Sequence, residues 1–341
     1  MKAWLRTLWV SQCLLGGCAV DDLVAAIRNE ACEGCNMPEP QLPCASVPAY
    51  SSTVAAAFAR LPVCACDEMS LGASLASGVA MGTDGDVSAS GALEGSSLTV
   101  GGSVQIGADD ARFGGSLLVG SRWRGEGPLS VGGDAGFGRA VRASSLQVGG
   151  TLAAPSEDDV DVPLDQLGFG TFLASAPTVE PPCACDMLPS FEALLPSVSA
   201  SVAVDLEVVD GDLELGLGCG VHALGQIRGS GAARIRVSGT VVLVVDRVAV
   251  DRLELEIPVG GELRLFVAED VLVPDGWSVE GGGRLRMIVG GRGTLRLPSD
   301  VSLDADLFAP EVELVVPGAA RWSGALWVDR IASSGPLELS E

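Results

Sequence analysis

A short motif, Leu-x-Val-Gly, occurs four times between residues 98 and 149 and constrains the fold more than any other feature. The copies begin at Leu98, Leu117, Leu129 and Leu146, so they are 19, 12 and 17 residues apart. Each copy alternates apolar and variable residues, as a half-buried strand does, and ends at a glycine, which allows turns without Cβ strain. Repetition of short strands at this length predicts the coils of a β-solenoid, with a β-sandwich as the alternative.

Longer apolar or alternating segments follow from residue 202. The run at 241–245 is apolar throughout and must therefore be covered on both faces. The alternating segments carry Glu and Arg on one face, where cross-strand pairs would set the register. These segments are 253–257, 263–267, 285–289, 295–297 and 312–316. Helical periodicity is absent here, so we expect an all-β fold of right-handed β-helix or solenoid-like units.

The start of the chain differs from the rest. Segment 21–28 begins with acids and has an apolar stripe at helical spacing, and segment 51–61 is alanine-rich with a serine cap. Together they predict a small α-helical, cystine-linked head before the β units. We divide the chain into a signal peptide (1–17), a helical Cys-rich head (18–62), a Gly-rich β-repeat unit (63–156), an acidic and Pro-containing linker (157–181) and a β-solenoid-like domain (182–341). For the acids within the linker, a weak Ca²⁺ site is the alternative to simple solvation.

The first residues have the pattern of an export signal, with a basic start, a short apolar stretch and small residues before Cys18. The tetrad at 15–18, Leu-Gly-Gly-Cys, resembles the bacterial lipobox. That resemblance implies cleavage before Cys18 and attachment of a diacylglyceryl group to its thiol, with palmitate among the expected acyl chains. The alternative is an ordinary secretory signal, or a short helix, with Cys18 in a disulfide. No stretch has 18 consecutive apolar residues, so we expect export and a lipid anchor at the cell envelope, on the outer membrane or the cell surface.

Eight of the ten cysteines remain once the signal peptide and Cys18 are set aside. They are Cys32, Cys35, Cys44, Cys64, Cys66, Cys183, Cys185 and Cys219. An even number in an exported chain favours disulfides. Two clusters are nearly identical, Pro-Val-Cys-Ala-Cys-Asp at 62–67 and Pro-Cys-Ala-Cys-Asp at 182–186. We interpret each as the opening of a structural unit.

Cysteine chemistry leaves other readings open. Thiolates also hold Zn²⁺ or Cu⁺, but the chain has one histidine and lacks zinc-finger spacing. Cys32 and Cys35 have the spacing of a redox motif without its βαβ context, which favours a structural bridge. Spacing does not define the pairing; within the second unit we expect Cys183 or Cys185 to bond to Cys219.

The formal net charge is −23, and removal of residues 1–17, which carry two basic residues and no acid, makes it −25. A surface this acidic repels nucleic acid and anionic lipid, so we expect no nucleic-acid partner. It could attract divalent cations or basic partners. The alternative is that the charge serves solubility alone.

The second half carries a series of short motifs. They are Cys-Ala-Cys-Asp at 183–186, Leu-Gly-Cys-Gly-Val-His-Ala-Leu at 217–224, Val-Ser-Gly-Thr at 237–240, Leu-Arg-Leu-Phe-Val at 263–267, Leu-Phe-Ala-Pro at 307–310 and Trp-Ser-Gly-Ala-Leu-Trp at 322–327. Through these motifs, residues 182–339 resemble an uncharacterised all-β domain of exported myxobacterial proteins and of some pilus-assembly-like proteins. The family's His-Tyr-Asp ending is replaced by Leu-Glu-Leu-Ser-Glu at 337–341. The resemblance implies a β-helix-like fold at the cell envelope and no known chemistry.

Catalytic motifs are sparse. A Ser/His/Asp or Cys/His set needs a base, and the only imidazole, His222, has the surroundings of a half-buried structural residue. The glycine runs at 281–283 and 290–291 precede strands and not helices, so they predict turns and not phosphate-binding loops.

Paired carboxylates are the one open catalytic route. Asp304 and Asp306 are i and i+2 neighbours on one side of a strand, a pairing that a glycosidase could use. Sugar stacking has three candidate tryptophans, Trp123, Trp322 and Trp327. Our leading hypothesis is a non-enzymatic structural or adhesive lipoprotein without a cofactor, which presents an acidic β surface to surface polysaccharide or an envelope protein. A carbohydrate-active β-helix enzyme is the alternative.

Overall fold

The computed structural model describes residues 7–9, 52–195, 204–208 and 211–340. It is mostly β, with 62% strand and 7% helix, and its coils form a β-solenoid of about 14 turns. The predicted solenoid is thereby confirmed over the sandwich. The chain divides into two compact units: unit 1 comprises residues 1–49 and 195–288, and unit 2 comprises residues 50–194 and 289–341.

Unit 2 consists of coils with three sides, each side a ladder of short parallel strands. Along the first side, Leu93 pairs with Leu75 and with Ala111, each 18 positions away. Along the second side, Leu98 pairs with Met81 and Leu117. The inward residues of these ladders are buried, and burying each one contributes about 1.5–3 kcal/mol. Bounds of the strands from residue 63 onward are β2 (Val63–Leu71), β3 (Leu75–Thr83), β4 (Asp86–Ala89), β5 (Leu93–Val100), β6 (Val104–Ile106), β7 (Ala111–Phe113), β8 (Leu117–Val119), β9 (Trp123–Gly125), β10 (Pro128–Val131), β11 (Ala135–Phe137), β12 (Val141–Arg142), β13 (Ser145–Ala154), β14 (Val160–Asp161) and β15 (Leu167–Ala174).

The three-sided coil explains the irregular spacing of the Leu-x-Val-Gly motif. The copies that begin at Leu98 and Leu117 lie on the second side, where they pair with each other. The copies that begin at Leu129 and Leu146 pair with each other on the first side. The step of 12 residues is therefore the passage from the second side of one coil to the first side of the next.

The motif glycines have a different role from the turns that the sequence suggested. A Cβ atom on Gly101, Gly120 or Gly132 would lie under 3.0 Å from a backbone carbonyl oxygen of the preceding coil. The amide of Gly120 donates a hydrogen bond of 2.8 Å to the carbonyl of Val100, one coil earlier. Close approach of stacked backbones, and not a left-handed backbone, is what requires glycine at these corners.

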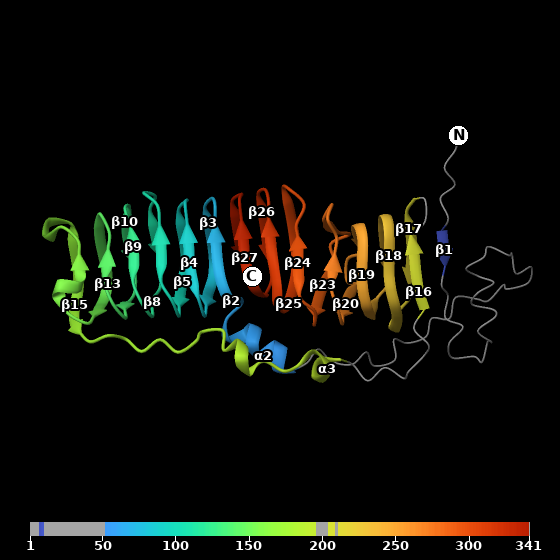
Figure 1. The fold of residues 1–341 in the computed structure, drawn as a ribbon, viewed down its shortest axis with the longest axis horizontal. Helices are drawn as coiled ribbons and strands as arrows, with labels where there is room; N and C mark the ends of the chain where they lie inside the picture. The colour runs from blue at the N-terminus through green and yellow to red at the C-terminus, as the bar shows by residue number, and fades with distance from the viewer. Residues whose placement is uncertain (1–6, 10–51, 196–203, 209–210, 341) are drawn as a thin grey trace, which may run out of the picture. The chain divides into compact units, whose positions relative to one another are not determined.

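The C-terminal coils of unit 2 stack on its first coil. Their strands are β24 (Gly293–Arg296), β25 (Val301–Val316), β26 (Ala320–Ser323), β27 (Leu326–Ser333) and β28 (Leu337–Ser340). Leu326 of β27 pairs with Val63 of β2, and Leu337 of β28 pairs with Leu75 of β3. Figure 1 shows β27 beside β2. Segments that are far apart in the sequence thus form adjacent coils.

After β15 the chain runs back across the coils of unit 2, as Figure 1 shows. We call residues 175–194 the return segment; it ends in the short helix α3 (Phe191–Leu194). A Cβ on Gly136 would meet Pro177, and one on Gly82 would meet Pro182, so the segment packs on the outer face of the second side. Helix α2 (Ser52–Arg60) confirms the helix expected at 51–61; the one expected at 21–28 lies outside the described residues.

The predicted domain limits differ from these units at the head, whose residues 50–62 belong to unit 2, at the linker and in the second domain. Residues 157–174 were expected to be a linker, but β14 pairs with β12 and β15 pairs with β13, so they form a further coil. The predicted domain 182–341 is divided, because 182–194 and 289–341 belong to unit 2. Acids and a proline at coil corners resemble a linker when only the local sequence is considered.

Unit 1 has longer coils. Gly220 pairs with Val241, 21 positions away, and Leu253 pairs with Trp277, 24 positions away. The apolar run at 241–245 lies in β19, and four of its five side chains are buried, consistent with cover on both faces. Bounds are β1 (Thr7–Trp9), β16 (Val204–Val208), β17 (Leu213–Leu217), β18 (Gly220–Val237), β19 (Thr240–Glu256), β20 (Glu262–Val267), β21 (Val271–Leu272), β22 (Trp277–Glu280) and β23 (Arg284–Val289). β1 is a parallel neighbour of β17.

Candidate functional site

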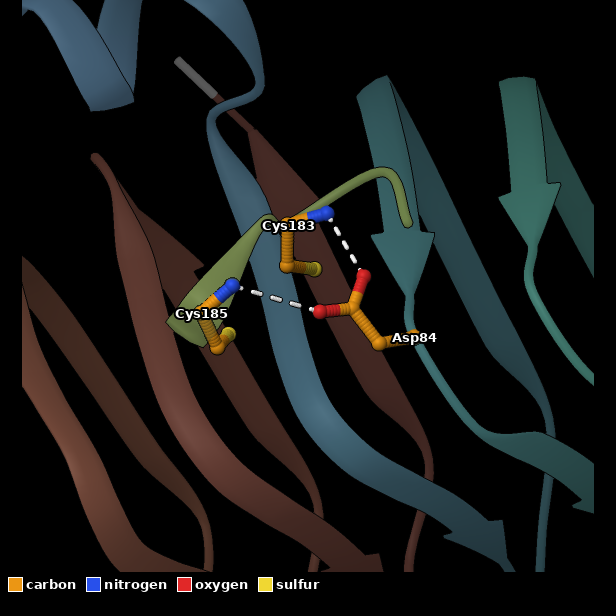
Figure 2. A group of neighbouring side chains, drawn as sticks. All are labelled: Asp84, Cys183 and Cys185. Carbon is orange, nitrogen blue, oxygen red and sulfur yellow. Dashed lines mark hydrogen bonds between the residues drawn. The ribbon is translucent and has the colours of Figure 1, made fainter. Parts of the chain in front are cut away.

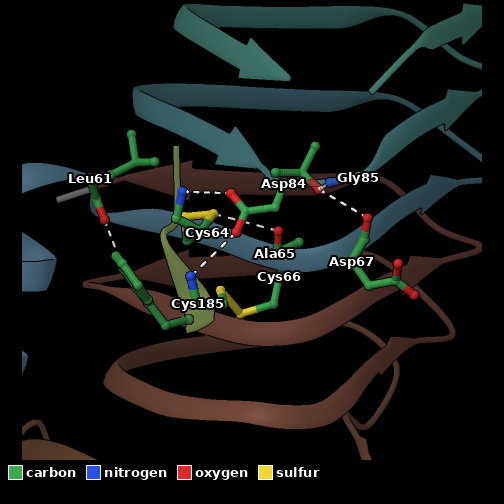
Figure 3. The surroundings of a disulfide bond; sticks show 11 residues. Leu61, Cys64, Ala65, Cys66, Asp67, Asp84, Gly85 and Cys185 are labelled. Atoms are coloured by element: carbon green, nitrogen blue, oxygen red, sulfur yellow. Dashed lines mark hydrogen bonds between the residues drawn. A yellow bond between two sulfur atoms is a disulfide. The ribbon is translucent and has the colours of Figure 1, made fainter. Parts of the chain in front are cut away.

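The two Cys-Ala-Cys motifs bond to each other. Cys64 pairs with Cys183 and Cys66 with Cys185, at Cα–Cα distances of 5.7 and 5.8 Å, and each bridge spans 119 residues. Because successive side chains of a strand point to opposite faces, Cys64 and Cys66 share the outer face of β2 while Ala65 is buried in the core. The motifs were expected to open two units. Instead they form one double clamp that holds the return segment to unit 2 (Figure 3).

A third contact fixes the clamp. The Asp84 carboxylate accepts hydrogen bonds from the backbone N–H groups of Cys183 (2.8 Å) and Cys185 (3.3 Å), as Figure 2 shows. Ala184 between them has a left-handed backbone, with φ of 49°, which turns both N–H groups toward the same anion. No sequence motif marks Asp84 as part of this site, because the segment that it binds lies about 100 positions away in the chain.

This cluster is also the group that could hold a metal. Within the described residues, the ligand atoms of Asp84, Cys183 and Cys185 lie within 4.8 Å of one another. Both sulfurs are committed to disulfides, and the carboxylate is hydrogen-bonded to the backbone. Soft metals bind thiolates, so only the reduced clamp could offer a site.

The remaining cysteine predictions have mixed outcomes. Cys219 is disulfide-bonded, but the expected bridge from Cys183 or Cys185 to Cys219 is wrong, because β2 supplies the partners of both. The lipidation candidate Cys18 and the disulfide candidates Cys32, Cys35 and Cys44 lie outside the described residues.

The acidic residues of the described parts are almost all at the surface; only Glu214 and Asp306 are buried. The predicted cross-strand pairs are present. Arg234 donates to Glu254 (Nε–Oε2 2.8 Å), and Arg236 bridges Glu256 and Glu214 on the two neighbouring strands. Arg234 and Glu254 are partners in the register of β18 and β19. Glu and Arg therefore set the alignment of adjacent coils, as the alternating pattern indicated.

Two carboxyl groups show how burial and charge compete on these faces. Burial raises the pKa of Glu262, but the hydrogen bond from Arg264 and the charge of Arg286 outweigh it, so its pKa is lowered overall. In unit 2 burial raises the pKa of Asp329, and the positive charge of Arg330 does not compensate for it.

The catalytic candidates do not assemble into a site. Trp123, Trp322 and Trp327 are at most 2% exposed, so the expectation that they could stack on sugars is wrong. They are core residues, as are Trp277, Phe137 and Phe308. Asp306 is 5% exposed and accepts a hydrogen bond from the amide of Ala325 (3.1 Å), whereas Asp304 is exposed.

His222 is half-buried, as the sequence suggested. Its Nε2 lies 2.8 Å from the carbonyl oxygen of Gly218, so the imidazole is part of a local turn. No helix of the described parts is long and apolar enough to cross a membrane. A comparison of the chain with protein-family models, with curated proteins and with solved structures gave no match to any of them.

Proposed function

We propose that this protein is a non-enzymatic lipoprotein of the cell envelope. Lipid on Cys18 anchors it, and the solenoid is a structural or adhesive scaffold that presents an acidic β surface to surface polysaccharide or to an envelope protein. The observation that carries the proposal is the placement of the acids, of which only two are buried in the described parts. The anchor is supported by the lipobox-like tetrad at 15–18.

The distribution of aromatic residues favours a scaffold over an enzyme. Glycosidic bonds are cleaved by a pair of accessible carboxyl groups, and the tryptophans that could have stacked on a sugar beside them lie in the core. Asp306, one of the two candidate carboxylates, is used within the fold to bind the backbone of the next coil. No observation favours the carbohydrate-active alternative.

Lipidation is tested by expressing a tagged full-length chain with an alkyne analogue of palmitate. We expect label on the wild type and on Cys13→Ala, which keeps the tetrad, and none on Cys18→Ala. Globomycin should block processing of the wild-type precursor, and fractionation should place the mature chain with membranes. If the wild-type precursor is processed normally under globomycin and the wild-type protein takes up no palmitate analogue, the lipid anchor is contradicted.

The scaffold role is tested separately from the anchor. We expect the Cys18→Ala chain to bind immobilised cationic polymer with an affinity that falls as salt rises, because screening weakens surface electrostatics. Release of reducing ends from a panel of envelope polysaccharides by the wild type, and its loss in Asp304→Asn, would establish the enzyme instead.

A further inference from the structure

Within the described residues, the coil of residues 156–174 stands at one end of unit 2 and has a neighbouring coil on one side only. We call it the end coil. Phe169 pairs in register with Val148 of the preceding coil, and Phe172 pairs with Leu152. Val148 and Leu152 are 5% and 0% exposed, whereas Phe169 is 40% exposed. The same inward positions are open here because the described residues place no further coil or cap over them.

The end coil also has a free strand edge. Strand β15 has eight residues and pairs in parallel with β13; within the described parts no strand lies on its other edge. Such an edge presents unpaired N–H and C=O groups, and natural solenoids normally protect it with a polar capping repeat. Here the edge instead exposes apolar side chains, with Leu173 52% and Leu164 88% exposed. An open edge beside apolar side chains is the geometry that accepts an added strand.

The charge of the end coil indicates which kind of partner would fit it. The end coil carries five acids and no basic residue: Glu157, Asp158, Asp159, Asp161 and Asp165. The sequence has no Lys or Arg from 143 to 227. Two copies of this chain joined end coil to end coil would bring these acids toward one another, and like charges repel over roughly 8 Å at physiological salt. A segment with Arg or Lys beside its apolar residues would complement the same surface.

We propose that the end coil docks an extended, basic β segment of a different protein, which continues the parallel ladder beyond β15. Its backbone would pair with the free edge, its alternating apolar side chains would cover Phe169 and Phe172, and its basic residues would face the acids of the coil. This inference goes beyond the proposed function, since it needs neither the lipid anchor nor the acidic side faces.

A probe with these properties exists within the chain itself. Residues 139–154 (Arg-Ala-Val-Arg-Ala-Ser-Ser-Leu-Gln-Val-Gly-Gly-Thr-Leu-Ala-Ala) include β13, already pair with β15 on its inner edge, and contain Arg139, Arg142 and no acid. The labelled synthetic peptide is titrated into full-length protein and followed by fluorescence anisotropy. The control peptide carries Arg139→Glu and Arg142→Glu.

We expect the basic peptide to bind at least about tenfold more tightly than the control peptide, and binding to weaken as salt rises. Hydrogen exchange should slow in residues 167–174 on addition of the basic peptide. Phe169→Lys should abolish binding, and Asp158→Lys with Asp165→Lys should remove most of the preference for the basic peptide. The matched control, Asp109→Lys with Asp275→Lys, has the same change in net charge on exposed acids outside the end coil and should leave binding unchanged. Circular dichroism verifies that each variant is folded.

Three outcomes would overturn the proposal. Equal affinity for the two peptides would remove the charge argument, and protection outside residues 167–174 would remove the site. A dimer of the full-length chain that forms in sedimentation experiments, grows with salt and is lost in Phe169→Lys would show that the occupant is a second copy.

Discussion

The two units build the same kind of coil at different lengths. In unit 2 neighbouring coils are mostly 17–19 positions apart, and columns of glycine let the backbone of one corner touch the carbonyl groups of the corner before it. In unit 1 the spacing is 20–24 positions, strands reach 18 residues, and Arg–Glu pairs join neighbouring coils. Both kinds of contact occur in both units, since Gly229 of unit 1 also lies close to a carbonyl group of the preceding coil and Arg321 of unit 2 pairs with Glu338. The units therefore differ in coil length and in how often each contact is used. The difference predicts that the units respond to different mutations and conditions.

The largest effect is expected from the clamp of unit 2. Both disulfides close nearly the same loop, so removing one leaves the closure entropy almost unchanged. Cys64→Ala with Cys183→Ala, or Cys66→Ala with Cys185→Ala, should each cost about 1 kcal/mol, whereas removal of both bridges should cost about 4–5 kcal/mol. Urea unfolding measures the three variants, and a sum of the two pair effects that equals the combined effect would contradict the shared loop.

The clamp should also open from one side. Cys64 and Cys183 are 0% and 1% exposed, while Cys66 and Cys185 are half-buried. A mild reductant should therefore reach the Cys66–Cys185 bridge first. Alkylation followed by mass spectrometry gives the order of reduction, and simultaneous loss of both bridges would contradict it.

The glycine columns come next in expected size. Gly120→Ala places a Cβ against the carbonyl group of Gly101, and we expect a loss of about 2–3 kcal/mol in the free energy of unfolding. Gly114→Ala is the control in the same unit, because a Cβ there meets nothing within 4 Å. If both variants have the same urea midpoint, close approach of the backbones is not what requires glycine at the coil corners of unit 2.

The ion-pair ladder of unit 1 should contribute less. Arg236→Gln leaves Glu214, which is 8% exposed, without its cation, and we expect a loss of about 1 kcal/mol that shrinks at high salt. Arg112→Gln removes exposed pairs with Asp110 and Glu94 in unit 2 and should change stability by under about 0.3 kcal/mol. Equal effects would show that the ladder has no special role in long coils.

The smallest effects separate the two units best, because one carboxyl substitution in each unit is expected to change the free energy of unfolding in opposite directions. The pKa of Asp329 is raised in the fold, so its charged form costs stability at neutral pH, and that cost disappears as pH falls through the raised pKa. Asp329→Asn should therefore stabilise unit 2 by roughly a few tenths of a kcal/mol at neutral pH, with the gain vanishing in acid.

Glu262 in unit 1 behaves in the opposite way. Its pKa is lowered, so its stabilising contribution is complete above the ordinary carboxyl pKa and is lost as pH falls through the depressed value. Glu262→Gln should destabilise at neutral pH and have little effect in strong acid. Urea midpoints measured from neutral to acidic pH test both variants. If both substitutions shift the midpoint in the same direction at neutral pH, the comparison between the units fails.

The sequence predicted those features that depend on neighbouring residues. Alternation within each Leu-x-Val-Gly copy identified buried positions such as Leu117 and Val119, and the Glu/Arg pattern identified the ladders. Which coil follows which could not be predicted, because every inward aliphatic strand can stack on any other. The pairing of Cys64 with Cys183 depends on the path of the return segment, and the burial of Trp327 depends on Leu61, whose carbonyl accepts its indole N–H.

The stacking of β27 on β2 has a consequence for the order of events during synthesis. The amide of Leu326 donates a hydrogen bond to the carbonyl of Pro62. One edge of the first coil therefore stays unpaired until the ribosome has added about 260 further residues. Long-range pairing of this kind folds slowly, since a large loop must close before the contact forms. A chain stopped before residue 326 would expose an apolar cross-section in the middle of unit 2 and not at its end. Completion of the final strands is thus the step that gives the first coil its second neighbour and covers the core of unit 2 at that point.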